Sequence, residues 1–178
     1  MLKVTYPTSR LSLSPLASDD AAEMMRVLDD VRLHEFIGGA PLSAEDLRVR
    51  YEKLAQGRSA DGLQIWINLI VRLAASDDAI GTVQATVSSD RASVAWVIGT
   101  PWQGRGYAVE ATSWLLEHVR KEHCVREVLA NIHPRHAASQ RVAVRLGFAR
   151  TDQILDGEEV WRLELSGSPP REVITRQP

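Results

Sequence analysis

Residues 96–108 read WVIGTPWQGRGYA, and the hydrophobic pattern changes its period in the middle of this stretch. Val94, Trp96 and Ile98 alternate along the chain, which predicts a strand. From Gly106 onward the apolar residues recur at helical spacing, which predicts a helix. Those residues are Ala108, Ala111, Leu115 and Val119. A strand therefore leads through a glycine-containing loop into a helix.

The loop between these two elements has the properties of an anion-binding site. The first N–H groups of a helix lack partners and the helix N-terminus carries partial positive charge. Such a loop suits a pyrophosphate. A dinucleotide-binding loop would have a third glycine where this chain has Val109, and the Gly-Lys-Ser/Thr ending of a P-loop is absent. Two glycines alone also leave open a plain strand-to-helix turn.

The segment before the loop predicts antiparallel strands. Apolar residues alternate over 63–73, 83–87 and 94–98, and the turns between these segments are very short. A parallel crossover needs a dozen or more residues, so the three strands are expected to form a meander. A further strand is expected over 10–14, ahead of two helices.

Capping and stop signals bound those two helices. The first is expected from Asp20 to about Asp30, because Asp20 and Glu23 resemble a capping box. The second is expected to begin at Ser43 and to end at Gly57.

The segment after the loop helix predicts a short strand, a helix and a closing hairpin. The strand covers 128–132, the helix ends at Gly147, and the hairpin turns at Asp156-Gly157. The complete order predicts an α/β fold with a mixed sheet of about seven strands and about four helices. We expect one domain over 1–165 and a loose tail over 166–178.

Composition narrows the classes of protein that fit. The 178 residues carry a formal net charge of −2, which gives no electrostatic case for nucleic acid or for an anionic membrane. No apolar run reaches the length of a membrane span, and no residue spacing resembles a metal site. The lone Cys124 is compatible with a cytoplasmic setting and is expected to be structural.

Two segments together resemble a known family. The loop QGRGYA (103–108) is similar to the coenzyme A loop of the GCN5-related N-acetyltransferases (GNAT), and HPRHAASQRVAVRLGF (133–148) resembles the second coenzyme A segment of that family. The likeness is strongest to the ribosomal-protein N-terminal acetyltransferase subgroup. It implies a mostly antiparallel sheet that splays between the strands before and after the loop helix. It also implies acetyl-CoA as co-substrate, without a metal.

The resemblance implies specific contacts for coenzyme A. The pyrophosphate is expected on the backbone N–H groups of the loop, and the pantetheine arm is expected in the splay. The residues implied are Trp96, Val97, Ile98, Gln103, Gly104, Arg105, Gly106, Tyr107, Ala108, Asn131 and Ser139.

The catalytic assignments are implied in the same way. Many members use a tyrosine where this chain has Ala143, so Ser139 is expected to serve the leaving thiolate instead, with a helix cap as the alternative reading. Glu158 and Glu35 are the candidates for the general base. His136 stands where the subgroup commonly has asparagine, and we interpret it as facing solvent.

The function that follows is transfer of an acetyl group to a primary amine, either a protein N-terminus or a small molecule. Three alternatives remain: a coenzyme A-binding module without turnover, a transferase that uses another acyl or aminoacyl donor, and a plain structural domain. The sequence does not identify the acceptor amine. A homodimer is compatible with it.

Overall fold

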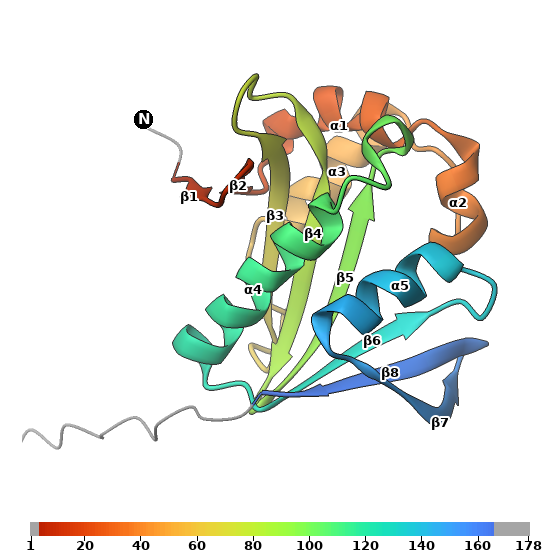
Figure 1. The fold of residues 1–178 in the computed structure, drawn as a ribbon. Helices are drawn as coiled ribbons and strands as arrows, with labels where there is room; N and C mark the ends of the chain where they lie inside the picture. Colours follow the sequence, from red (N-terminus) through yellow and green to blue (C-terminus); the bar gives the residue numbers. More distant parts are fainter. Residues whose placement is uncertain (1–3, 166–178) are drawn as a thin grey trace, which may run out of the picture.

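The computed structural model describes residues 4–165, so the predicted tail over 166–178 lies outside the described residues. Within them the strands form one eight-stranded sheet in the order β1-β2-β3-β4-β5-β6-β8-β7 (Figure 1). The strands are β1 (Tyr6–Pro7), β2 (Leu11–Pro15), β3 (Ile65–Leu73), β4 (Ala79–Ser88), β5 (Arg91–Ile98), β6 (Glu127–Ile132), β7 (Ala149–Leu155) and β8 (Glu158–Glu164). The α-helices are α1 (Ala21–Leu28), α2 (Val31–Ile37), α3 (Ala44–Leu54), α4 (Tyr107–His123) and α5 (Ala137–Leu146). Two 3₁₀ turns, η1 (Ser18–Asp20) and η2 (Thr100–Trp102), precede α1 and follow β5.

The fold confirms the predicted α/β class and corrects two counts. The sheet has eight strands rather than seven, because the two-residue β1 pairs with β2. The described chain has five α-helices rather than four, because the first predicted helix ends at Leu28 and α2 begins after Asp30. The Asp30 carboxylate accepts the Arg32 N–H at 3.0 Å, which starts this separate helix.

The predicted capping box at Asp20 and Glu23 is wrong. Asp20 accepts the N–H of Ala17 at 2.9 Å and pairs with Arg72 of β3 at 3.1 Å. Glu23 accepts the N–H of Ala79 at 2.9 Å and also pairs with Arg72. Both carboxylates therefore tie the start of α1 to the sheet. In α3 the predicted signal is confirmed, since Ser43 accepts the Asp46 N–H at 3.1 Å.

The sheet is antiparallel except between β5 and β6. These two strands are parallel and are paired only from Arg91–Ser93 to Glu127–Leu129. Beyond Ser93 the two strands diverge, as Figure 1 shows. The connection through α4 makes them parallel, as a crossover helix requires. The predicted splay is therefore confirmed at the strands on either side of α4.

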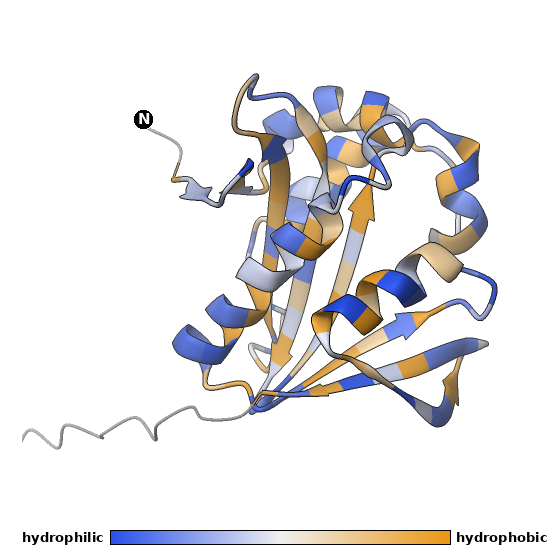
Figure 2. Ribbon diagram, in the orientation of Figure 1, coloured by the Kyte–Doolittle hydropathy of each residue, from blue (hydrophilic) through white to orange (hydrophobic). Residues whose placement is uncertain are grey.

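Helices cover both faces of the sheet. On one face α4 packs Ala111, Leu115 and Val119 against apolar residues of β2–β6. On the other face α1 and α3 form a second cluster, which contains Met24 and Leu47. Apolar residues run along the central strands, and the C-terminal end of α4 is strongly hydrophilic (Figure 2). The two clusters hold β5 and the start of α4 in place.

Candidate active site

Two glycines shape the loop between β5 and α4. Gly104 and Gly106 have φ angles of 76° and 82°, in the left-handed region that favours glycine. Gly106 is the residue immediately before α4. The Gln103 side-chain amide donates to the Ile98 carbonyl at 2.8 Å, which ties the loop back to the end of β5. The loop therefore turns sharply at the N-terminus of a 17-residue helix.

The backbone N–H groups of this turn are free. Among the hydrogen bonds of residues 4–165, none is donated by the N–H groups of residues 104–109. The first paired N–H of the helix belongs to Glu110, which donates to the Gly106 carbonyl at 3.1 Å. Successive unpaired N–H groups and the positive end of the helix dipole together favour an anion.

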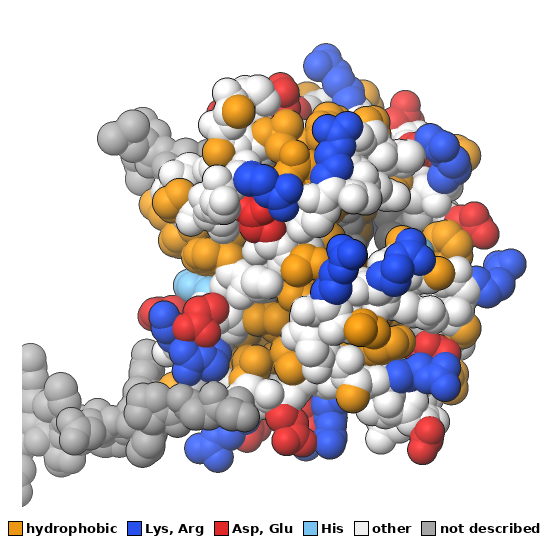
Figure 3. Space-filling view, in the orientation of Figure 1, with side chains coloured by type: hydrophobic (Ala, Val, Ile, Leu, Met, Phe, Trp, Pro, Cys, Tyr) orange, Lys and Arg blue, Asp and Glu red, His pale blue; other side chains and the backbone are white. Residues whose placement is uncertain are grey.

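A cavity of about 630 Å³, here called the loop cavity, opens beside these N–H groups. Its lining includes Trp96, Val97, Ile98, Gln103, Gly104, Gly106, Tyr107, Ala108, Glu35 and Ser139. Four arginines that sequence reasoning missed also line it: Arg32, Arg135, Arg141 and Arg145. Figure 3 shows basic side chains over α5 and around the loop before α4. Arg141 and Arg145 are one helical turn apart on α5, which is the signal that could have found them.

Arg105, which was predicted to contact coenzyme A, lies outside the loop cavity. Arg105 is exposed, and it is the one residue between Gln103 and Ala108 that does not line the loop cavity. Asn131, also predicted to contact coenzyme A, lines a different cavity.

That second cavity, here called the α3 cavity, has a volume of about 410 Å³. Apolar residues of α1 and α3 form part of its wall, including Met25, Leu28, Leu47 and Leu54. Its ionisable side chains are His34, Arg50, Tyr51, His133, His136 and Glu158. Burial raises the pKa of Tyr51 to about 12, so this phenol stays neutral at physiological pH.

The two cavities meet in the splay between β5 and β6. The residues that line both are Phe36, Trp96, Val97, His136 and Ser139. The Phe36 ring stacks on His136 with centroids 4.3 Å apart and an interplanar angle of 6°. Ligands bound in the two cavities can therefore come into contact beside the Phe36–His136 stack.

His136 is half-buried at this junction, so the interpretation that it faces solvent is wrong. Burial lowers the pKa of His136, the neighbouring His133 lowers it further, and Glu35 opposes the shift. The lowered pKa favours the neutral imidazole at pH 7. His136 also occupies the N-cap position of α5, so the capping alternative for Ser139 is wrong.

The structure separates the two candidate bases. Glu158, at the start of β8, is half-buried and lines the α3 cavity. Glu35, on α2, is exposed and lines the loop cavity. Ala143 is fully buried in the core, and Cys124 lines neither cavity. Only Ser139 of the three predicted catalytic residues lies at the junction.

The described residues contain no group of three or more His, Cys, Asp or Glu side chains that could hold a metal ion. None of the helices in residues 4–165 is long and apolar enough to cross a membrane.

Solved structures share this architecture along most of the chain. A GNAT-family acetyltransferase from Bacillus anthracis is 17% identical, with a TM-score of 0.74 over 90% of this chain and 98% of that chain. RimL, a ribosomal L7/L12 alpha-N-protein acetyltransferase solved with coenzyme A, is 14% identical, with a TM-score of 0.75 over 91% and 98%. The acetyltransferase MccE, solved with acetyl-CoA and AMP, is 14% identical, with a TM-score of 0.75 over 89% and 94%. At these identities the likeness establishes the fold.

The sequence itself matches a family model. No curated protein matches the sequence. The model of the acetyltransferase (GNAT) domain matches residues 10–149, which include the loop, α4 and all of α5. The chain therefore belongs to the GNAT acetyltransferase family, which confirms the acyltransferase class predicted from residues 103–108 and 133–148.

Proposed function

We propose that this chain transfers an acetyl group from acetyl-CoA to a primary amine, with both substrates bound at once. The observation that carries this proposal is the meeting of two cavities in the splay, one of them bordered by free loop N–H groups. Because the two sites meet at one point, the amine can attack the acetyl carbonyl directly, so no covalent enzyme intermediate is needed.

The loop cavity fits the donor. The free N–H groups of residues 104–108 suit its diphosphate, and Arg141 and Arg145 supply positive charge for phosphate groups. The unpaired edge of β5 beyond Ser93 suits the amide-containing pantetheine arm. The solved complexes of MccE with acetyl-CoA and of RimL with coenzyme A support this assignment.

Residues at the junction and in the two cavities beside it each carry one part of the reaction. The attacking amine forms a C–N bond to the acetyl carbonyl, the C–S bond breaks, and the leaving thiolate takes up a proton from water, to which the base later returns the proton of the amine. Ser139 donates a hydrogen bond to the leaving sulfur, and a backbone N–H near Val97 polarises the carbonyl. Glu158 accepts the proton of the amine, because it lines the cavity on the acceptor side. Glu35 is the alternative base.

The α3 cavity takes the acceptor. It joins apolar walls to the charged side chains of Arg50 and Glu158, so it suits an amine carried on a partly apolar group. A protein N-terminus, the acceptor class in the name of RimL, and a small-molecule amine both fit this description.

Titration calorimetry with coenzyme A and a thiol-release assay with acetyl-CoA and a panel of peptides and small amines test the proposal. We expect coenzyme A binding and amine-dependent thiol release. Absence of coenzyme A binding would contradict the function, whereas binding without release from any amine would favour a module without turnover.

Ser139→Ala tests the role of the junction serine. We expect kcat to fall about 100-fold, the scale for loss of one hydrogen-bond donor to a charge that develops in the transition state, while the KM for acetyl-CoA changes little. Ser113→Ala, an exposed serine on α4, is the matched control and should behave as the wild type. An unchanged kcat in Ser139→Ala would remove this role.

A further inference from the structure

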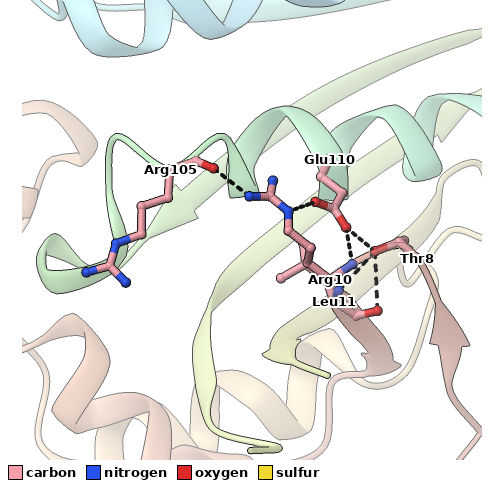
Figure 4. Close-up of polar contacts among 5 residues, drawn as sticks. All are labelled: Thr8, Arg10, Leu11, Arg105 and Glu110. Atoms are coloured by element: carbon pink, nitrogen blue, oxygen red, sulfur yellow. Dashed lines mark hydrogen bonds and ion pairs between the residues drawn. The ribbon is translucent and has the colours of Figure 1, made fainter. Parts of the chain in front are cut away.

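Arg10, which directly precedes β2, connects the N-terminal segment to the loop almost one hundred residues away (Figure 4). Its Nε donates to Glu110 Oε2 at 2.7 Å, and its Nη1 donates to the Arg105 carbonyl at 2.9 Å. The guanidinium also lies over the Tyr107 ring, 4.7 Å from its centroid. The Arg10 side chain thus contacts three residues of the turn from the loop into α4, namely Arg105, Tyr107 and Glu110.

Glu110 is fixed by more than this one ion pair. Its Oε1 accepts the backbone N–H of Arg10 at 2.7 Å and the Thr8 hydroxyl at 2.6 Å (Figure 4). The Glu110 side chain is only 15% exposed. Burial alone would raise the pKa of Glu110, but the hydrogen bonds from Thr8 and Arg10 hold it below its ordinary value. The carboxylate is therefore ionised and fully engaged at neutral pH.

The bond to the Arg105 carbonyl determines where the next N–H points. In a trans peptide the C=O of one residue and the N–H of the next point in opposite directions within one plane. Arg10 takes the Arg105 carbonyl on the β2 side, so the Gly106 N–H points away from Arg10. Gly106 lines the loop cavity and Arg105 does not, in agreement with this orientation.

The bonds to Glu110 have an electrostatic consequence. Glu110 belongs to the first turn of α4, next to the free N–H groups. An untethered carboxylate there would compete for these N–H groups and would repel a phosphate. Arg10 and Thr8 hold the carboxylate turned toward β2, and Arg10 neutralises its charge.

We infer, on the basis of the proposed acetyl transfer, that Arg10 is a positioning residue for the acyl donor: it orients the Gly106 N–H toward the loop cavity and restrains Glu110. Arg10 lines neither cavity, so its effect on the donor passes through the loop. Loss of the Arg10 side chain should therefore weaken binding of the diphosphate of the donor.

Arg10→Ala is the first variant. We expect the KM for acetyl-CoA and the dissociation constant of coenzyme A to rise about ten- to hundred-fold, the scale of one or two charge-assisted hydrogen bonds. We expect kcat and the KM for the amine to stay within about two-fold of the wild type. Arg91→Ala is the matched control, because the exposed Arg91 side chain forms an ion pair with Glu127 at 3.0 Å at the start of β5 and lines neither cavity.

A second donor separates positioning from general damage. S-acetylpantetheine keeps the thioester arm and lacks the diphosphate, so Arg10→Ala should not change kcat/KM for this donor. Equal losses with both donors would overturn the inference, and so would an unchanged KM for acetyl-CoA.

Arg10→Lys covers the case in which Arg10→Ala does not fold. Lysine keeps the charge opposite Glu110 but has no planar fork to bond the Arg105 carbonyl as well. We expect a thermal midpoint near that of the wild type and a raised KM for acetyl-CoA, and a KM equal to the wild type would count against positioning. If the wild type itself bound no coenzyme A, the proposed function would fail first, and this result would be visible before any variant is compared.

Discussion

Glu158 and Glu35 have the same chemistry and stand on different sides of the junction. Glu158 borders the α3 cavity and Glu35 borders the loop cavity. A general base must come within hydrogen-bond reach of the amine, directly or through one water. Geometry therefore favours Glu158, although sequence reasoning treated the two residues alike.

Exchanging each carboxylate for its amide tests this assignment. Glu158→Gln should lower kcat about 100-fold or more at neutral pH, with unchanged coenzyme A affinity. Glu35→Gln should leave kcat nearly unchanged, and it serves as the matched control. Steady-state kinetics with both substrates varied would measure the effect, and a larger loss in Glu35→Gln would reverse the assignment.

At the scale of elements, the close approach of β4 and β5 sets the position of the strand that lines both cavities. Gly81 of β4 pairs with Ile98 of β5. A side chain on Gly81 would collide with the Val97 carbonyl oxygen and would lie 2.9 Å from Ile98 Cδ1. Glycine at this position lets β5 run close to β4 up to the splay.

Gly81→Ala should therefore destabilise the fold. Overpacking of this kind costs about 1–3 kcal/mol, and each kcal/mol lowers Tm by about 2–4 °C in a chain of this size. Because Val97 must shift, activity should fall as well. Calorimetry would measure the change, with Ser88→Ala at the exposed end of β4 as the control. A Tm equal to that of the wild type would show that β5 can move away from the added methyl group at no cost in stability.

Hydrophobic period and turn residues made some helices and strands predictable from the sequence, but not all of them. The strand before the loop, α4, α5 and the turn at Asp156-Gly157 follow from period and from turn residues, and the structure has them. The two missed elements have weak local signals. The short helix α2 begins with the exposed Val31, and β1 exists only through its pairing with β2.

The candidate site also has a part that could be predicted from the sequence and a part that could not. The loop could be recognised because its residues are contiguous. The arginines of α5, the position of His136 and the contact from Arg10 to the loop depend on segments that only the topology brings together. Sequence spacing places Arg141 and Arg145 on one face of a helix, but it does not show which other segment that face meets.

At the scale of the whole molecule, two partly buried histidines make the stability depend on pH. Burial is the main cause that lowers the pKa of His136 and of His118. His136 faces His133, which lowers its pKa further, and Glu35, which opposes the shift. His118 packs on Trp114 and faces His123, which lowers its pKa, and Glu122, which opposes the shift.

A lowered pKa in the folded state means that the unfolded chain binds the proton more readily. Stability is therefore complete above about pH 6.5, the ordinary histidine value, and is lost as pH falls through the folded-state pKa values. Thermal unfolding between pH 7.5 and 5.5 should show a falling Tm. His118→Gln and His136→Gln should each flatten this slope, and an unchanged slope in the double variant would assign the pH dependence to other groups.

Three residue pairs join β5 to β6, so the sheet has two parts, β1–β5 and β6, β8 and β7, which beyond this seam are held together by side-chain packing. A pantetheine chain lying in the splay would bond to both parts of the sheet and act as a removable cross-link. Coenzyme A at one hundred times its Kd should add about 2.7 kcal/mol to the unfolding free energy. Hydrogen exchange should slow in the loop amides of residues 104–109 and in those amides of residues 94–98 and 130–132 that face the splay, so the substrate would complete the sheet that the polypeptide leaves open.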